Sequence, residues 1–243
     1  MRVLSVTQLP FCWPAPRRGP LSRHTPKASG FFNTLECAID TRETTGHIVV
    51  CMARANVREK LVTAGLDTLY RRGFNGCGVE DITRAAGVPK GSFYNYFESK
   101  EALGIEVLER FWQSGGPRLK ILRDHTLPPV ERLRRYFDSL ADVLADWDHQ
   151  TGCMIGNFST ELSNQSRAIR ERLSLILTEW TRAIEACVRE AQKAGQTRTD
   201  LDPATIATFL INAWEGTCSR TKVDKDRKAV EHFREIVFTT LFR

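Results

Sequence analysis

Hydrophobic positions recur every three or four residues along most of the chain, and no stretch alternates with a period of two. That spacing places apolar side chains on one face of an α-helix. It is clearest between residues 166 and 194, where one stripe contains Ile169, Leu173, Ile176, Trp180, Ile184, Cys187 and Ala191. The sequence therefore predicts an all-α protein.

Further helices follow from the same spacing and from capping residues. Apolar positions predict a helix over residues 54–72 and another that Ser99 caps and that stops near residue 115. A stripe over residues 133–147 follows two prolines. Asp202 can cap the next helix, and a last helix is expected near residues 224–242.

The segment from residue 74 to residue 103 predicts two short helices at a steep angle. The first is expected over residues 79–86 and the second over residues 90–96, with Gly87 in the turn between them. Glycine takes a positive φ there without steric cost. This arrangement predicts a helix-turn-helix.

The outer face of the second short helix is polar and free of acids. No Asp or Glu occurs between Ile82 and Phe97, and this surface suits a polyanion. A helix fits the major groove of B-DNA, where Lys, Ser, Asn and Tyr can donate to phosphates or base edges. Double-stranded DNA is therefore the expected partner.

These motifs resemble those of the TetR/AcrR family of transcriptional regulators, in order and in spacing. The resemblance rests on Gly73-Phe74, residues 79–82, residues 85–88, residues 90–97 and residues 100–103. It implies that Tyr94 and Asn95 face bases, whereas Tyr96 and Lys100 hold the DNA backbone. The expected DNA-binding set is Arg54, Val79, Lys90, Gly91, Ser92, Tyr94, Asn95, Tyr96 and Lys100.

One departure from the family pattern is Gly78, at the start of the first short helix. Family members often carry Ser or Thr there, whose side-chain oxygen can cap the helix. Glycine lacks that oxygen, so a cap bond is expected to be missing.

The expected domains are a helix-turn-helix domain over residues 52–99 and a helical domain for ligand binding and dimerisation over residues 100–243. Residues 1–51 contain five prolines and no sustained period, and they are expected to be disordered or a mis-annotated extension, with translation starting at Met52. The helix after Ser99 is expected to link the two domains.

Charge and cysteine content bear on the possible partners and on the cellular setting of the protein. The net charge is +6, but residues 52–243 hold 29 basic residues against 26 acidic ones, so total charge says little about partners. Seven unpaired-looking cysteines indicate a reducing, cytoplasmic setting. No run is long enough to span a membrane. No motif for catalysis, a cofactor or a metal site is recognisable, so an enzyme of helical fold is a distant alternative.

The resemblance also implies a homodimer, built by the last two helices, that binds a near-palindromic operator and releases it when a small effector binds. An activator, or a DNA binder without a ligand, is the alternative. The candidate effector-site residues lie on helices that the family arranges around a cavity: Trp112, Phe137, Trp147, Cys153, Asn157, Phe158, Trp180 and Trp214. For any single aromatic residue among them, ordinary core is the favoured interpretation, and only the set as a whole indicates a pocket.

Cys153 lies in a string, residues 152–162, similar to a segment of family members that sense electrophiles. We expect Cys153 at a helix N-terminus, where the helix dipole favours thiolate, although Asp146 and Asp148 oppose it. A reactive sensor and an inert core thiol are both compatible with the sequence. Cys187 and Cys218 are expected to be structural.

Overall fold

The protein was analysed as a computed structural model that describes residues 45–242, with side chains described from residue 56 onward. The expectations for residues 1–44 lie outside this range. Arg54 lies within the first helix, but its side chain is also outside the described part, so its predicted DNA contact stays a prediction.

The described residues are almost entirely helical, as predicted. The elements are α1 (Thr45–Arg72), α2 (Val79–Ala86), α3 (Lys90–Phe93), α4 (Lys100–Ser114), α5 (Gly116–Leu119), the 3-10 turn η1 (Ile121–Arg123), α6 (Pro129–Asp146), α7 (Met154–Leu162), α8 (Arg167–Lys193), α9 (Pro203–Asp224), α10 (Lys228–Ile236) and the π turn η2 (Val237–Leu241). Within the described residues, β pairing is limited to one isolated bridge between Thr197 and Phe242.

Three helix starts are fixed by capping side chains, and two of these residues, Ser99 and Asp202, were predicted from the sequence. The Ser99 hydroxyl accepts a hydrogen bond from the Ala102 amide at 3.1 Å. Ser166 and Asp202 cap α8 and α9 in the same way, each over 3.1 Å. Each cap satisfies an amide that has no partner inside its helix.

Three helix bounds differ from the prediction. The second short helix was expected over residues 90–96, but α3 ends at Phe93. The chain then tightens into a turn, in which the Tyr96 amide bonds to the Phe93 carbonyl at 3.0 Å and Phe97 is buried beside Phe93. In addition, α1 begins upstream of residue 54 and the last helix begins only at Lys228.

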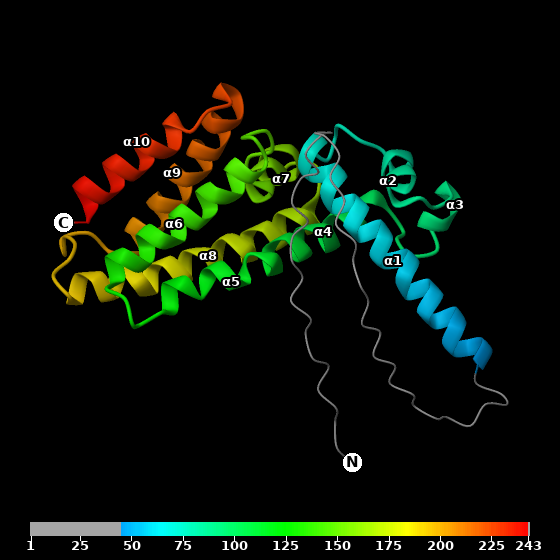
Figure 1. Ribbon diagram of the computed structural model, residues 1–243, viewed down its shortest axis with the longest axis horizontal. Coiled ribbons are helices and arrows are strands. Elements are labelled where there is room, and N and C mark those ends of the chain that lie inside the picture. The colour runs from blue at the N-terminus through cyan, green and yellow to red at the C-terminus, as the bar shows by residue number, and fades with distance from the viewer. Residues whose placement is uncertain (1–44, 243) are drawn as a thin grey trace, which may run out of the picture.

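The helices form two parts with a junction between them (Figure 1). One part holds α1, α2 and α3, and the other is a bundle of α6, α8, α9 and α10. The junction consists of α4, which packs on α1 and α8, and α7, which packs on α4 and α8. The two parts are therefore joined by helix packing at the junction, in addition to the covalent connection of the chain.

The close approach of α4 to Phe74 needs a glycine. A Cβ atom at Gly104 would lie 2.9 Å from a ring carbon of Phe74, which is below the contact distance of two carbon atoms. Phe74 in turn meets Phe158 of α7 edge-on, with ring centres 5.8 Å apart. Phe74 thus lies between α4 and α7.

A buried arginine holds the bundle at α6. The Arg132 side chain is 2% exposed, donates to the Leu122 carbonyl at 3.0 Å and to the Glu190 carboxylate of α8 at 2.5 Å. The hydrogen bond from Arg132 is the main cause that lowers the pKa of Glu190. This pair joins α6, η1 and α8.

We expect Glu190→Ala to lower the free energy of unfolding by about 2–3 kcal/mol, because the buried Arg132 guanidinium would lose its counter-charge. Glu185→Ala on the same helix removes only an i,i+4 pair with Arg189 and should cost less than about 0.5 kcal/mol. Urea unfolding measures both values.

The difference between these variants should also depend on pH. Because the pKa of Glu190 lies below its ordinary value, its contribution is present near neutral pH and is lost as the pH falls through the lowered pKa. Equal unfolding free energies for the two variants at neutral pH would contradict this account.

Candidate functional site

The turn between α2 and α3 has the geometry that Gly87 predicted. Gly87 has a φ of 65°, and the next amide, of Val88, closes the turn on the Thr83 carbonyl at 3.0 Å. Ile82, Phe93 and Phe97 are buried beneath the two helices. These contacts fix α3 and the following turn as one rigid surface.

That surface presents polar side chains. Tyr94 is 58% exposed, and its ring stands edge-on against Phe93 with centres 5.3 Å apart. Lys90, Gly91 and Asn95 are exposed, whereas Ser92 and Tyr96 are half-buried. The exposed side chains can donate to a DNA groove.

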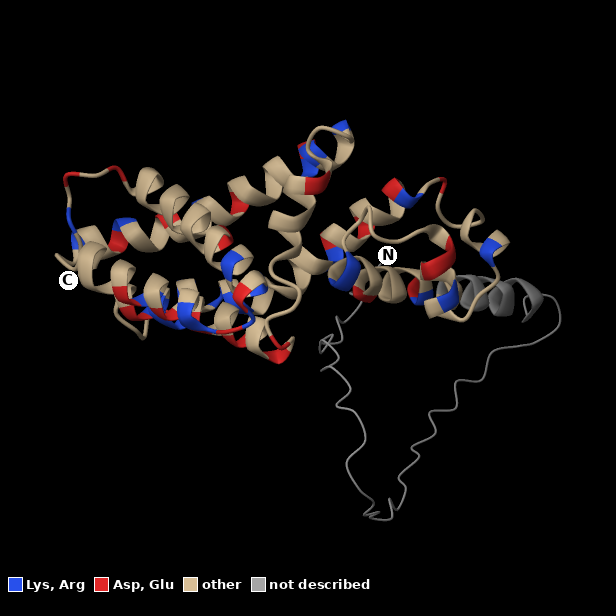
Figure 2. Cartoon of the chain, turned by 90° about the horizontal axis from the view of Figure 1, so that it is seen from above, with Lys and Arg blue, Asp and Glu red and all other residues tan. Residues whose placement is uncertain are grey.

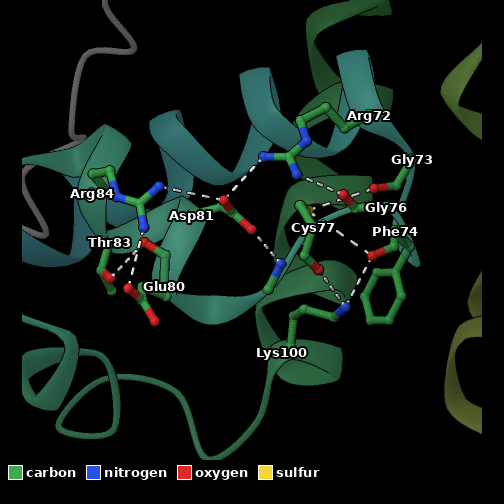
Figure 3. Close-up of polar contacts among 11 residues, drawn as sticks. Arg72, Gly73, Phe74, Gly76, Cys77, Glu80, Asp81, Thr83, Arg84 and Lys100 are labelled. Atoms are coloured by element: carbon green, nitrogen blue, oxygen red, sulfur yellow. Dashed lines mark hydrogen bonds and ion pairs between the residues drawn. The ribbon is translucent and has the colours of Figure 1, made fainter.

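The loop of residues 73–77, which joins α1 to α2, is held from α4 (Figure 3). The Lys100 ammonium donates to the carbonyl oxygens of Phe74 and Cys77, each at 2.9 Å. It also lies 4.1 Å from the centre of the Phe74 ring, where the π-electrons attract a cation.

The same loop is held from α1 and α2. Arg72 donates to the Gly76 carbonyl at 2.8 Å and pairs with Asp81 at 3.1 Å (Figure 3). Asp81 accepts the Gly78 amide at 2.8 Å, and this hydrogen bond is the main cause that lowers the pKa of Asp81. The side-chain cap that Gly78 lacks is absent, as predicted, and Asp81 supplies the other cap bond of α2.

The second notable feature is a cavity of about 300 Å³ at the junction. Its wall comes from both parts of the molecule, because Tyr70 of α1 lies in it beside residues of α4 to α9. Most of the lining is apolar or aromatic, including Trp112, Trp147, Trp180 and Trp214. Such a lining is typical of small-molecule sites.

Cys153 precedes α7 and lines the cavity, next to Glu215 of α9. Burial, followed by the charge of Glu215, raises the pKa of Cys153 well above its ordinary value. Burial also raises the pKa of Glu215 to about 7, against a hydrogen bond from the Cys153 thiol. The predicted helix N-terminus is therefore present, but the predicted preference for thiolate is wrong in this conformation.

The pKa values of the other described thiols are also raised. Burial raises the pKa of Cys77, of Cys218 and of Cys187, the last to about 11. All four described cysteines are free, as expected of reduced thiols.

Two family models match the chain. Residues 61–107 match "Bacterial regulatory proteins, tetR family", and residues 129–237 match "Tetracyclin repressor-like, C-terminal domain". The HTH-type transcriptional repressor DhaR from Mycobacterium sp. (strain GP1) is 44% identical over 191 residues, which cover 78% of this chain and 94% of DhaR. The chain belongs to the TetR family of transcriptional regulators.

Solved structures of TetR-family proteins agree with this assignment. The regulatory protein TetR from Rhodobacter sphaeroides has a TM-score of 0.72 and 31% identity, covering 76% of this chain and 98% of that one. The reduced form of NemR from E. coli has a TM-score of 0.67 and 25% identity, covering 77% and 97%. The predicted family, all-α fold and helix-turn-helix are thus confirmed.

Family membership makes α2 and α3 the DNA-reading unit, but the individual DNA contacts stay predictions. Lys90, Gly91, Ser92, Tyr94, Asn95 and Tyr96 lie on one surface. Val79, at the start of α2, is half-buried against the core. Lys100 was expected to hold the DNA backbone, yet its ammonium is directed at carbonyls of its own chain. The structure therefore gives Lys100 a role within the reader.

The cavity contains five of the eight predicted effector-site residues. Trp112, Trp147, Cys153, Trp180 and Trp214 line it. The other three are turned elsewhere. Phe137 packs in the bundle core between Trp214 and Phe233, Phe158 packs on Phe74, and the Asn157 amide donates to the Thr151 carbonyl at 2.9 Å.

Several lining residues were not predicted, chiefly Tyr70, Arg118 and Tyr136. Tyr136 belongs to the apolar stripe of α6, so its position on the inner face could have been inferred. No sequence signal marks Tyr70, which belongs to a reader helix, or Arg118, which follows a Gly-Gly-Pro stretch.

Charges of both signs are spread over both parts of the molecule (Figure 2). On the reader, the Nζ atom of Lys90 lies 3.6 Å from the Oε2 atom of Glu80 on α2. Among the described residues, no cluster of three or more His, Cys, Asp or Glu has the geometry of a metal site, and no helix is long and apolar enough to span a bilayer.

We expect Lys100→Met to lower the free energy of unfolding by about 2 kcal/mol, because two carbonyls lose a charged donor. Lys90→Met, at an exposed position with one loose ion pair, should change it by less than about 0.5 kcal/mol. In contrast, only Lys90→Met should flatten the salt dependence of DNA binding, by about one unit in slope.

Urea unfolding and DNA titrations over a range of salt concentrations measure the two effects. A Lys100→Met protein with unchanged stability and a flatter salt slope would instead indicate that Lys100 binds phosphate.

Proposed function

We propose that this chain is a ligand-responsive transcriptional repressor that binds a near-palindromic operator as a homodimer and releases it when a small effector fills the cavity. The observation that carries the proposal is the cavity wall shared by reader and bundle. Tyr70 of α1 lines the cavity and donates to the Gly152 carbonyl, which precedes α7, at 2.7 Å. A ligand there acts directly on the first helix of the reader.

A second connection runs along α7. Cys153 and Ile155 line the cavity at its start. Near its end, the Glu161 carboxylate accepts the Asn75 amide of the reader loop at 2.8 Å. A ligand that displaces the start of α7 therefore moves a group bonded to the loop between α1 and α2.

A third connection runs along α4. Trp112 and Ser114 line the cavity at its C-terminal end, and Lys100 holds the reader loop at its N-terminal end. Effector binding would favour a conformer in which the two readers no longer match the groove spacing. Coupling of this kind commonly changes affinity by about 5–150-fold.

The dimer is proposed to form through α9 and α10. Phe209 and Ile236 are 52% and 60% exposed there, and the outward positions of α9 near Phe209 are uncharged, namely Thr205, Thr208, Asn212, Gly216 and Ser219. Paired α9 and α10 helices from two chains would bury these side chains. A two-fold dimer then presents two readers about 34–36 Å apart.

Repression, as opposed to activation, is supported by the relatives. DhaR and NemR are both named HTH-type transcriptional repressors. A salt-sensitive complex with the DNA upstream of the chain's own gene, which a cavity ligand weakens, would be the direct demonstration. Operator affinity that no cavity ligand alters would leave a ligand-independent DNA binder.

We expect Tyr94→Ala to reduce the preference for that upstream DNA over unrelated DNA by about tenfold or more, because the exposed ring is proposed to contact bases. Tyr94→Phe removes only the hydroxyl, so it distinguishes the contribution of the hydroxyl from that of the ring. Competition gel shifts at fixed salt measure the preference. Equal weakening on both DNAs would assign Tyr94 to the DNA backbone.

We expect Phe209→Asp to raise the dimer dissociation constant by at least about 100-fold, because a two-fold interface would bury the unpaired carboxylate twice. Leu175→Asp is the matched control, since Leu175 is equally exposed but lies on α8. Analytical ultracentrifugation distinguishes them. An unchanged dimer in Phe209→Asp would place the interface elsewhere.

A further inference from the structure

Three hydrogen-bond donors in the cavity wall form no side-chain hydrogen bond of normal geometry with an acceptor among the described residues. The first is the guanidinium of Arg118 on α5, which is half-buried and forms no ion pair or side-chain hydrogen bond with them. The second is the hydroxyl of Tyr136 on α6, a residue that is 2% exposed. The third is the Trp180 indole N–H on α8, which is buried without a hydrogen bond of normal geometry.

All three donors line the same cavity. Burial raises the pKa of the Tyr136 phenol, while a hydrogen bond from the Trp180 N–H and the positive charge of Arg118 act in the opposite direction. Leaving the buried Trp180 N–H without an acceptor costs free energy, and a ligand can supply acceptors to all three donors.

The remaining polar groups of the wall are already used or lie at its edge. The Tyr70 and Ser114 hydroxyls donate to the carbonyls of Gly152 and Phe111, each at 2.7 Å. Asp146 is exposed. The lining thus combines a large apolar surface with one cluster of donors, and that cluster carries a full positive charge.

We propose that the effector is a small organic acid whose carboxylate binds Arg118, Tyr136 and Trp180 and whose apolar body lies against the other tryptophans. This inference rests on the proposed function of the cavity as the effector site. A guanidinium can donate two parallel hydrogen bonds to one carboxylate. The phenol and the indole are placed to donate to the remaining lone pairs.

Two acids could oppose an anion in the cavity. Asp146 is exposed and therefore screened by water. Glu215 is buried, but its pKa of about 7 leaves it neutral in about half of the molecules near neutral pH. The negative charge of Asp146 and Glu215 therefore does not cancel the attraction of the Arg118 guanidinium for an anion.

Hexanoate and hexanamide are suitable probes, because they share the same chain and differ in charge. Four of the five tryptophans line the cavity, so intrinsic fluorescence reports binding directly. We expect hexanoate to bind the full chain at least about tenfold more tightly than hexanamide, since a hydrogen bond to a charged group is the stronger kind.

Arg118→Gln should remove that preference, whereas Arg123→Gln should keep it. Arg123 is the matched control because it lies in the neighbouring turn, is exposed and does not line the cavity. Arg118→Lys, which keeps the charge but loses the planar fork, should give an intermediate preference. Tyr136→Phe should weaken hexanoate and leave hexanamide nearly unchanged.

Equal binding of the two probes, absence of hexanoate binding at millimolar concentration, or an unchanged preference in Arg118→Gln would each overturn the carboxylate site. Operator binding is measured in the same samples by fluorescence anisotropy. A protein that binds hexanoate through Arg118 but never binds its upstream DNA would refute the proposed function and leave the carboxylate site standing. Intact operator binding without a preference for hexanoate would refute the carboxylate site and leave the proposed function standing.

Discussion

The loop of residues 73–77 is held by hydrogen bonds from several directions at once, and the position of the reader depends on it. Lys100 reaches it from α4, Glu161 from α7 and Arg72 from α1. A loop of this length would otherwise be free to pivot. Because two of these three partners, Lys100 and Glu161, belong to the junction helices, the orientation of α2 and α3 follows the position of α4 and α7.

The cavity lies at the other end of the same two helices. Trp112 at the end of α4 and Cys153 before α7 both line it. In the proposed function, a ligand and an operator are linked through these two helices, each in contact with the loop at one end and with the cavity at the other. Tyr70 adds a direct contact from α1. Two-state movement of such packed elements is how small shifts become changes in affinity.

Features that depend on a local interaction could be predicted from the sequence. Ser99 and Asp202 cap helices through amides three residues away, and Gly87 fixes its own turn. Features that depend on partners distant in sequence could not be predicted. The carbonyls that bind Lys100 come from another element, and its DNA contact stays a prediction. Burial, followed by the charge of Glu215 on α9, raises the pKa of Cys153, so the predicted preference for thiolate is wrong.

The aromatic residues show the same limit. Phe137 of α6 and Trp214 of α9 are both buried and both pack on Phe233, but of the two only Trp214 lines the cavity. Helical spacing gives the buried face and not the depth at which a ring ends. Arg118 could not be recognised at all, since only the folded chain shows it unpaired beside Tyr136.

The contacts of Tyr70 and Phe74 limit how this regulator can be divided. Both side chains are buried on the reader side, yet their covers are Phe111, Trp147 and Phe158, which follow residue 99. A fragment cut at that boundary would expose two large rings to water. The smallest transplantable module therefore extends through α7, and a hybrid regulator that keeps this reader must inherit part of the ligand chamber with it.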